Sequence, residues 1–286
     1  MNQLSDNKQC VVIFPIYKPL TTWEQASFEQ AIRMTPGFVH IFIAPQSFLF
    51  DKTFGELANL DIVHFSDEFF CNIQGYNSLM LNIEFYKHFQ DFDYMLIHQS
   101  DAYLFKDELQ HWCDQNYDYI GAPWFNKKFP KSFKWKKFKL KYLHFIYSQK
   151  QKENKFHHFI DNQVGNGGLS LRKIATFITV LEATPHQLLN KYKAGDQIRF
   201  NEDVFWALEA EKIKKTFKKP SCLQALHFSF EQEPALAFET INTLPFGCHA
   251  FNIHGTEFWK QHIPFIKSIP NNDARKFVKT TVSETL

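Results

Sequence analysis

The sequence contains few cysteines, and none of them lies in a metal-binding or disulfide pattern. The five cysteines are scattered, odd in number and outside any Cys-x-x-Cys pair. This usage argues against a zinc knuckle or a disulfide framework and is typical of a reducing compartment. The first eight residues are polar and lack the apolar core of a secretory signal. We therefore expect a cytoplasmic protein.

Long apolar runs, strong net charge and internal repeats are also absent. No apolar stretch is long enough to cross a bilayer. The net charge of +2 does not suit a chain that binds polyanions as a whole, and no recognised nucleic-acid module is present, so no nucleic-acid partner is expected. The glycine-rich residues 165–168 are not followed by Gly-Lys-Ser/Thr, which argues against a Walker phosphate loop.

Aromatic residues, by contrast, are abundant. They make up 17% of the 286 residues, with 33 phenylalanines, and hydrophobic residues make up 44%. Most of these rings belong in a core, and the others could line a sugar site. The length suits one large α/β domain, which we place at residues 9–270, followed by a polar tail at 271–286.

Strand and helix signals alternate through the first half of the sequence. Apolar runs predict buried strands at residues 10–16 and 94–98, and two further strands are predicted at 39–44 and 61–65. A capping box formed by Thr21 and Glu24 predicts a helix at 22–34, and helical periodicity predicts another at 76–89. This order predicts an α/β fold with a mostly parallel sheet flanked by helices. Later predicted elements are helices at 201–211 and 233–241 and a strand at 223–230.

The strand predicted at 94–98 ends directly before a carboxylate. Gln99, Ser100 and Asp101 follow it, and ligands of open α/β sheets bind beyond the carboxyl ends of the strands. Asp101 could hold Mg²⁺ or Mn²⁺, with a diphosphate completing the shell, or it could only cap a turn. Other donor-binding candidates, for which simple packing is the alternative, lie at or just after strand ends: Pro15, Tyr17, Gly75, Tyr76 and Asn77.

Two further segments carry candidates with two interpretations each. Gly165, Gly167 and Gly168 would let the backbone approach a ligand closely, with Asn166 between them as a further donor-binding candidate, or would form a plain turn. Glu202 and Asp203 could act as acid–base groups, or could favour the positive end of a helix dipole.

Three ring-bearing residues are candidates as well. Trp124 follows a Gly-Ala-Pro turn and could form a platform for an acceptor, or pack in the core. His249 lies in a turn after Pro-Phe-Gly and could be a metal ligand or a structural histidine. His254 is a weaker candidate for the same role.

Five segments occur in an order that is specific as a set: QSDA at 99–102, YDYIGAPW at 117–124, VGNGG at 164–168, NEDVF at 201–205 and PFGCHAF at 245–251. Through them the sequence resembles a family of predicted bacterial and fungal glycosyltransferases first catalogued as a domain of unknown function. That family looks related to the GT-A nucleotide-sugar transferases. The resemblance runs from about Val11 to Phe251 and implies a GT-A-like nucleotide-sugar-binding fold.

The resemblance also implies roles for single residues. Fringe-like inverting transferases carry a similar Glu-Asp-Val with the Asp as catalytic base, which points to Asp203, with Glu202 in reserve. A late histidine of GT-A enzymes often binds the metal or the diphosphate, which points to His249 beside Asp101, with Mn²⁺ or Mg²⁺ as cofactor. Many GT-A enzymes have Asp-x-Asp at the strand end, and here the first position is Gln99, so a metal needs another ligand or more water.

Residues 126–155 differ in composition from the rest and are interpreted as an insertion. Eight lysines lie between residues 127 and 141, aromatic residues are interleaved with them, and no acid precedes Glu153. The segment Lys127 to Tyr147 could be a solvated basic loop, an interfacial segment that attracts anionic lipid, or a recognition element for an anionic acceptor.

The expected function is a UDP-sugar-dependent, inverting glycosyltransferase. It would add a sugar to a hydroxyl of a surface polysaccharide or glycoconjugate intermediate, in the cytoplasm or on the inner face of the membrane, with a glycan or lipid-linked glycan as acceptor. The alternatives are a catalytically inactive glycan- or membrane-binding module, a retaining transferase and a nucleotidyltransferase.

Overall fold

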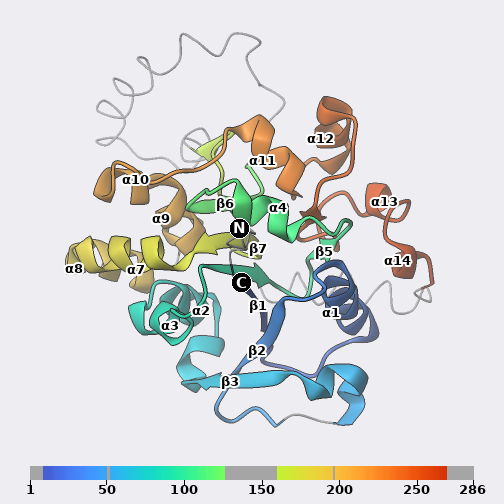
Figure 1. The fold of residues 1–286 in the computed structure, drawn as a ribbon, viewed down its shortest axis with the longest axis horizontal. Coiled ribbons are helices and arrows are strands. Elements are labelled where there is room, and N and C mark those ends of the chain that lie inside the picture. Colours follow the sequence, from blue (N-terminus) through green and yellow to red (C-terminus); the bar gives the residue numbers. More distant parts are fainter. Residues whose placement is uncertain (1–8, 50–51, 126–159, 196, 269–286) are drawn as a thin grey trace, which may run out of the picture.

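A six-stranded sheet forms the centre of the computed structural model, which describes residues 9–49, 52–125, 160–195 and 197–268 (Figure 1). In spatial order its strands are β3 (Asp61–Phe65), β2 (Val39–Pro45), β1 (Cys10–Pro15), β4 (Tyr94–His98), β7 (Leu169–Lys173) and β6 (Tyr119–Gly121). The first four are parallel, and β7 runs antiparallel to both β4 and β6. The predicted α/β class with a mostly parallel central sheet is confirmed. The predicted insertion at 126–155 and the tail at 271–286 lie outside the described residues.

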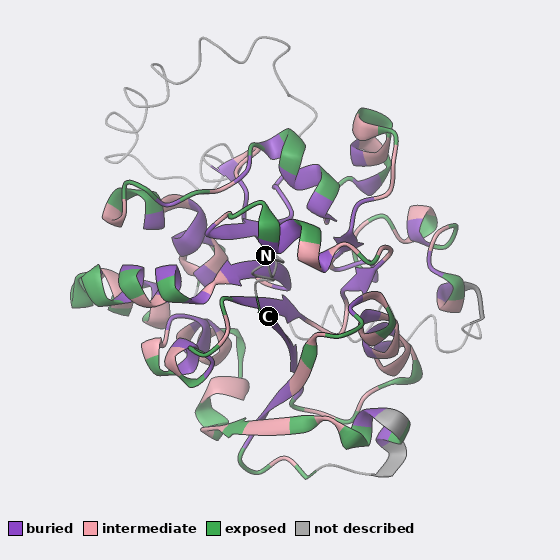
Figure 2. Cartoon of the chain, in the orientation of Figure 1, coloured by how far each residue is buried: buried purple, intermediate pink, exposed green. Residues whose placement is uncertain are grey.

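Alternate residues of the central strands enter two separate cores. Val11 and Ile13 of β1 belong to one cluster, and Val12 and Phe14 belong to the other. Successive side chains of a strand point to opposite faces, so a strand covered on both sides reads as a continuous apolar run. The edge strand β3 is only half-buried, as Figure 2 shows.

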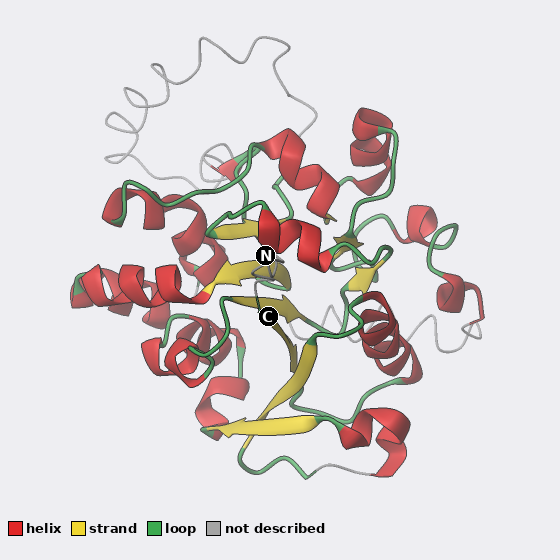
Figure 3. Cartoon of the chain, in the orientation of Figure 1, coloured by secondary structure: helices red, strands yellow, loops and turns green. Residues whose placement is uncertain are grey.

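Helices cover both faces of this sheet (Figure 3). The helices that pack in the core containing Val11 and Ile13 are α2 (Ile73–Met80), α3 (Ile83–His88), α7 (Ile174–Ala183), α8 (His186–Ala194), α9 (Glu202–Leu208) and α10 (Ala210–Ile213). Those packed in the core of Val12 include α1 (Thr22–Met34), η1 (Lys52–Asn59) and α4 (Leu109–Asp114). Two short helices complete this part, η2 (Asp67–Phe70) and η4 (Ile198–Phe200). Within the described residues, no helix has the length and apolar character needed to span a membrane.

A second sheet of three short strands lies beside the first. Its order is β5 (Tyr103–Leu104), β9 (Gly247–Cys248) and β8 (Ser229–Phe230). A third core joins it to α11 (Cys222–Phe228), α12 (Pro234–Ile241), α13 (Thr256–Trp259) and α14 (Pro264–Ser268). Because β5 follows β4 after a short turn, this sheet brings the residues after β8 and β9 to the end of β4.

Local signals explain why α1 begins where the sequence predicts. The backbone N–H of Thr21 donates to Glu24 Oε2 at 2.8 Å, and Thr21 Oγ1 accepts from the backbone N–H of Glu24 at 3.4 Å. This capping box satisfies two donors of the first turn. The helix then runs from Thr22 to Met34, in agreement with the prediction.

Two predicted elements differ from the structure. The strand predicted at 223–230 is wrong, because residues Cys222–Phe228 form α11 and only Ser229–Phe230 form a strand. Ser221 and Gln224 form a capping box that starts this helix. The helix predicted at 76–89 is divided into α2 and α3, because the Asn82 side chain accepts from Glu84 N at 3.0 Å and caps a new helix.

Candidate functional site

Three side chains meet just beyond the end of β4. His249 Nε2 lies 3.2 Å from Asp101 Oδ1 and 3.2 Å from Gln99 Oε1. Gln99 is held by its backbone, whose N–H donates to the carbonyl of Gly168 at 2.8 Å. His249 directly follows β9, and its backbone N–H donates to the carbonyl of Phe230. The two sheets together therefore place one imidazole, one carboxylate and one amide around a common point.

The charge of this cluster depends on two carboxylates that flank the imidazole. Asp101 lies at Nε2, and Glu231 Oε1 lies 3.2 Å from Nδ1. Burial alone would lower the pKa of His249, but the two carboxylates raise it to about 10. In turn His249 holds the pKa of both carboxyls below their usual values against the opposing effect of burial.

The positions of Gln99, Asp101 and His249 suit a divalent cation. Neighbouring ligands of a six-coordinate ion with metal–ligand bonds of about 2.1 Å lie roughly 3 Å apart, and the two separations at Nε2 are both 3.2 Å. Among the residues that the structure describes, no three His, Cys, Asp or Glu side chains form a metal-binding group. The third group here is the amide oxygen of Gln99, which is also a ligand for hard cations.

Sequence reasoning missed Glu231. It lies directly after β8, and its Oε2 is buried with no hydrogen-bond partner among the described residues. The same reasoning that singled out Asp101 at the end of one predicted strand applies to Glu231, since the segment predicted as a strand at 223–230 ends just before it. Its partner, His249, lies 18 residues later in the sequence.

The glycine-rich turn before β7 serves the packing of this cluster. Asn166 takes a left-handed conformation (φ 78°), and its Oδ1 accepts from the backbone N–H groups of Gly168 and Leu169 at 2.8 and 3.0 Å. A Cβ on Gly167 would collide with Glu202, and a Cβ on Gly168 would collide with the His249 ring. Both glycines therefore admit close contact with protein side chains.

Glu202 faces the interior and forms an ion pair with a fully buried arginine. Its Oε1 lies 2.9 Å from Arg172 Nη2, and the two side chains are 3% and 0% exposed. Arg172 also donates to Tyr86 Oη at 2.8 Å and to Ser170 Oγ at 3.0 Å. Asn77 Oδ1 accepts from the backbone N–H of Glu202 at 3.1 Å. Sequence reasoning missed Arg172, which reads as an ordinary strand residue.

Asp203, one residue later, is only half-buried and differs electrostatically from Glu202. Its Oδ1 accepts from the backbone N–H of Val204 at 2.8 Å. Burial, with the negative charges of Glu202 and Glu231, raises the pKa of Asp203 to about 7. A carboxyl group with this pKa can take up a proton near neutral pH.

The other predicted residues lie in different surroundings. Tyr17 is 48% exposed after β1, and Tyr76 has a buried hydroxyl. Ser100 Oγ donates to Glu24 Oε1 at 3.0 Å, so this hydroxyl is bound to α1. A Cβ on Gly75 would collide with the carbonyl of Glu68, which explains the glycine by packing.

Trp124 belongs to the core rather than to an exposed surface. It is 9% exposed, and a Cβ on Gly165 would collide with its six-membered ring.

A sequence model of the family described as "Protein of unknown function (DUF5672)" matches residues 59–249, about two-thirds of the chain. The chain belongs to this family. A search of curated proteins gave no match.

Three solved structures similar to this DUF5672 protein are glycosyltransferases. Mouse xyloside xylosyltransferase 1, in its apo form, has a TM-score of 0.49 at 7% identity, covering 85% of this chain and 97% of its own. A glycosyltransferase involved in glycosylation of the major capsid of PBCV-1 has a TM-score of 0.47 at 8% identity, covering 89% and 98%. Galactosyltransferase LgtC, in complex with donor and acceptor sugar analogs, has a TM-score of 0.42 at 12% identity, covering 92% and 98%.

Proposed function

We propose that this DUF5672 protein is a glycosyltransferase that uses a nucleotide-sugar donor, with UDP as the nucleotide and inversion at the anomeric carbon. The observation that carries the proposal is the meeting of Gln99, Asp101 and His249 beyond the carboxyl end of β4. Ligands of open α/β sheets bind at this edge. In this proposal residues 9–270 act as one GT-A-like domain.

Gln99, Asp101 and His249 would hold Mn²⁺ or Mg²⁺, because their oxygen and nitrogen atoms already lie at the spacing of neighbouring ligands. When bound, the cation supplies positive charge for the diphosphate of the leaving nucleotide. His249 has to lose its second ring proton to become a ligand, so cation binding at this site would release a proton. Glu231 would then accept a hydrogen bond from Nδ1 and hold the ring in place.

Asp203 would act as the general base. It would take the proton of the acceptor hydroxyl while the hydroxyl oxygen forms its bond to the anomeric carbon and the bond to the diphosphate oxygen breaks. Its pKa of about 7 leaves a useful fraction ionised at neutral pH. Glu202 would not take this proton, because Arg172 neutralises it in the interior; its role would be to fix the start of α9.

The other candidates would shape the donor site. Tyr17 offers an exposed ring for the base after Pro15 ends β1. Tyr76 and Asn77 would contact the donor from α2. Gly75 and Ser100 would shape the site indirectly, Gly75 by its close contact with the carbonyl of Glu68 and Ser100 by its hydrogen bond to Glu24. Asn166, Gly167 and Gly168 would position the donor sugar, and Trp124 would act on the acceptor side by supporting Gly165.

The acceptor would be a glycan or a lipid-linked glycan, and the protein would act in the cytoplasm. The basic segment Lys127 to Tyr147 would attract the anionic inner face of a membrane, since eight of its residues are lysines. This segment lies outside the described residues, so the membrane contact is proposed from the sequence alone.

Titration calorimetry with UDP, GDP and CMP, each with and without Mn²⁺, tests the donor site. We expect UDP to bind most tightly and Mn²⁺ to strengthen its binding. Preference for another nucleotide would contradict UDP as the donor nucleotide. Binding that is unchanged by a chelator would contradict the cation site and leave the nucleotide site standing.

A further inference from the structure

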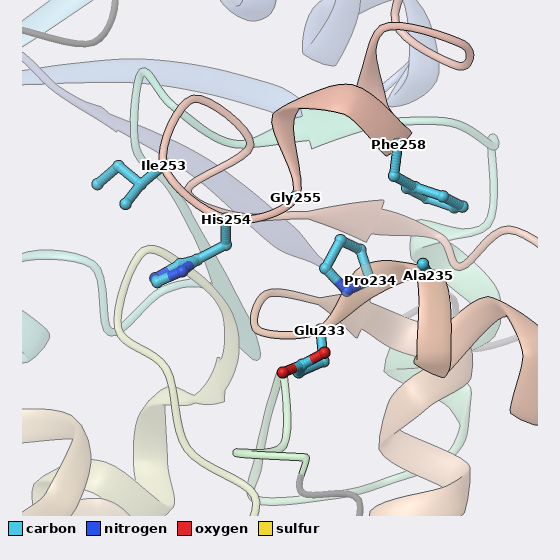
Figure 4. A pocket seen from close by; sticks show the side chains of 7 residues that line it. All are labelled: Glu233, Pro234, Ala235, Ile253, His254, Gly255 and Phe258. Atoms are coloured by element: carbon cyan, nitrogen blue, oxygen red, sulfur yellow. The ribbon is translucent and has the colours of Figure 1, made fainter.

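A cavity of about 310 Å³ lies beside the candidate site and has no role in the function proposed above. It is bounded by the start of α12 and by the turn before α13, and its lining residues are Glu233, Pro234, Ala235, Ile253, His254, Gly255 and Phe258. Figure 4 shows Glu233 and His254 on one side, Phe258 on the other and Pro234 between them. The side with Glu233 and His254 is mainly polar, although Ile253 lies beside His254, and the side with Phe258 is apolar.

Backbone conformation gives this cavity its shape. Glu233 and Gly255 both take left-handed conformations, with φ of 51° and 67°. A Cβ on Gly255 would collide with the ring of Pro234, so glycine is needed where the two turns meet. The walls are held by α12 and α13, and the ring of Phe258 packs on Phe238 with centroids 5.7 Å apart.

The cavity is connected to the candidate site through short stretches of chain. Ala250, which follows His249, is left-handed (φ 51°), and its carbonyl accepts from the N–H groups of Ile253 and His254 at 3.0 and 2.9 Å. This tight turn brings His254 back towards Glu231, whose pKa it helps to hold down. Glu233, on the same side of the cavity as His254 (Figure 4), is two residues from Glu231. His254 and Glu233 therefore connect the cavity to the cluster of His249 and Glu231.

The lining suits a neutral sugar better than a phosphate. The carboxylate of Glu233 can accept hydrogen bonds from hydroxyls and would repel an anion. The rings of Phe258 and Pro234 offer apolar surface for the C–H face of a pyranose (Figure 4). The volume lies at the lower end of the roughly 300–1,000 Å³ of small-molecule sites, which gives room for about one sugar residue.

We propose that this cavity binds the acceptor saccharide as a neutral pyranose, with its hydroxyls towards Glu233 and His254 and its C–H face on Phe258. The inference rests on the proposed glycosyltransferase function and adds the acceptor class to it. It predicts that acceptor and donor bind on different groups of residues, so that each can be weakened separately.

The test measures saccharide and UDP binding to the full chain in parallel. Ligand-observed NMR would use methyl glycosides of glucose, galactose, mannose and N-acetylglucosamine, with methyl glucuronide as the anionic comparison. Calorimetry would measure UDP with Mn²⁺. The variants are Glu233→Gln and Phe258→Ala, and the matched control is Glu257→Gln, because Glu257 lies on α13 outside the cavity and its side chain is 86% exposed.

We expect at least one neutral glycoside to bind, and Glu233→Gln to weaken it about tenfold, the loss of one charge-assisted hydrogen bond. Phe258→Ala should weaken it at least as much, while UDP binding stays unchanged in every variant and Glu257→Gln resembles the wild type. If Phe258→Ala fails to fold, the glycoside and UDP affinities of Glu233→Gln alone test the proposal.

Three outcomes would overturn the inference while UDP still binds the wild type: no neutral glycoside binds, the variants bind it as well as the wild type, or the glucuronide binds more tightly than every neutral glycoside. Equal weakening of UDP in the two variants would also overturn it, because the cavity would then belong to the donor. Failure of the wild type to bind any nucleotide would instead overturn the proposed function.

Discussion

Two adjacent acidic residues show how the surroundings decide a role at the scale of one residue. Glu202 and Asp203 are equivalent in the sequence, and both lie in the first turn of α9. Glu202 turns inward to the guanidinium of Arg172, whereas Asp203 is half-buried, and burial with the charges of Glu202 and Glu231 outweighs the weaker effect of Arg172 on its pKa. The sequence could predict the acidic pair but not this division, because Arg172 lies 30 residues away.

The raised pKa of Asp203 gives a pH dependence whose direction can be checked. A carboxyl with a pKa of about 7 is protonated below that pH and cannot act as a base. We expect kcat/KM to rise with pH through a limb centred near 7 and to level off above it. This limb should be absent from the residual activity of Asp203→Asn. A wild-type profile that is flat from pH 5 to 8 would contradict the assignment.

The ion pair of Arg172 and Glu202 should contribute to stability. Glu202→Gln leaves a guanidinium that is 0% exposed without its counter-charge, and breaking a buried pair costs about 3–5 kcal/mol. Urea unfolding should show a loss of this order. The control Glu257→Gln breaks an exposed pair with Lys260 and should give an unfolding curve that overlays the wild type. If Glu202→Gln and Glu257→Gln give the same unfolding curve, the buried ion pair does not contribute to the stability of the fold.

At the scale of secondary-structure elements, local sequence signals predicted α1 correctly but predicted a strand where the structure has α11. The Thr21–Glu24 capping box fixed the start of α1. Residues 223–230 form a short, mainly apolar segment, and such segments suit a strand or a buried helix equally well. The deciding signal was the capping box of Ser221 and Gln224, which begins two residues before this segment.

The glycine turn before β7 offers a test of how one element positions another. Gly168→Ala should push the His249 ring away from Asp101, because the new Cβ would occupy the place of that ring. We expect the Mn²⁺-dependent part of UDP binding to fall about tenfold or more, as for the loss of a charge-assisted contact.

Two controls separate this effect from a general loss of stability. Gly37→Ala also strains a left-handed glycine (φ 81°), but no atom lies within 4 Å of the new Cβ, so UDP binding should stay unchanged. The double variant Gly168→Ala/His249→Ala should bind UDP as weakly as His249→Ala alone, since both changes act on one ring. If the losses of UDP affinity from the two substitutions add up in the double variant, Gly168→Ala does not act by displacing the His249 ring.

At the scale of the whole molecule, the sequence predicted the parallel half of the fold better than the assembly of the site. Mostly apolar runs located β1 to β4, because a strand is a local feature of the sequence; β1 and β4 are buried throughout, whereas β3 at the edge is half-buried. The second sheet joins strands that begin at residues 103, 229 and 247. No local pattern encodes these long-range pairings, so the contact between Glu231 and His249 was not foreseen. The residues at the end of β4 were predicted, because a strand end is a local feature.

We propose that this site transfers sugars with Asp203 as the base. The most direct test measures UDP release from a panel of UDP-sugars by the wild type and by Asp203→Asn, with Mn²⁺, alongside UDP binding to both. We expect the wild type to release UDP from at least one donor, with a rate that falls roughly 10²–10⁴-fold in Asp203→Asn while UDP binding is retained. Release by Asp203→Asn at the wild-type rate would contradict it.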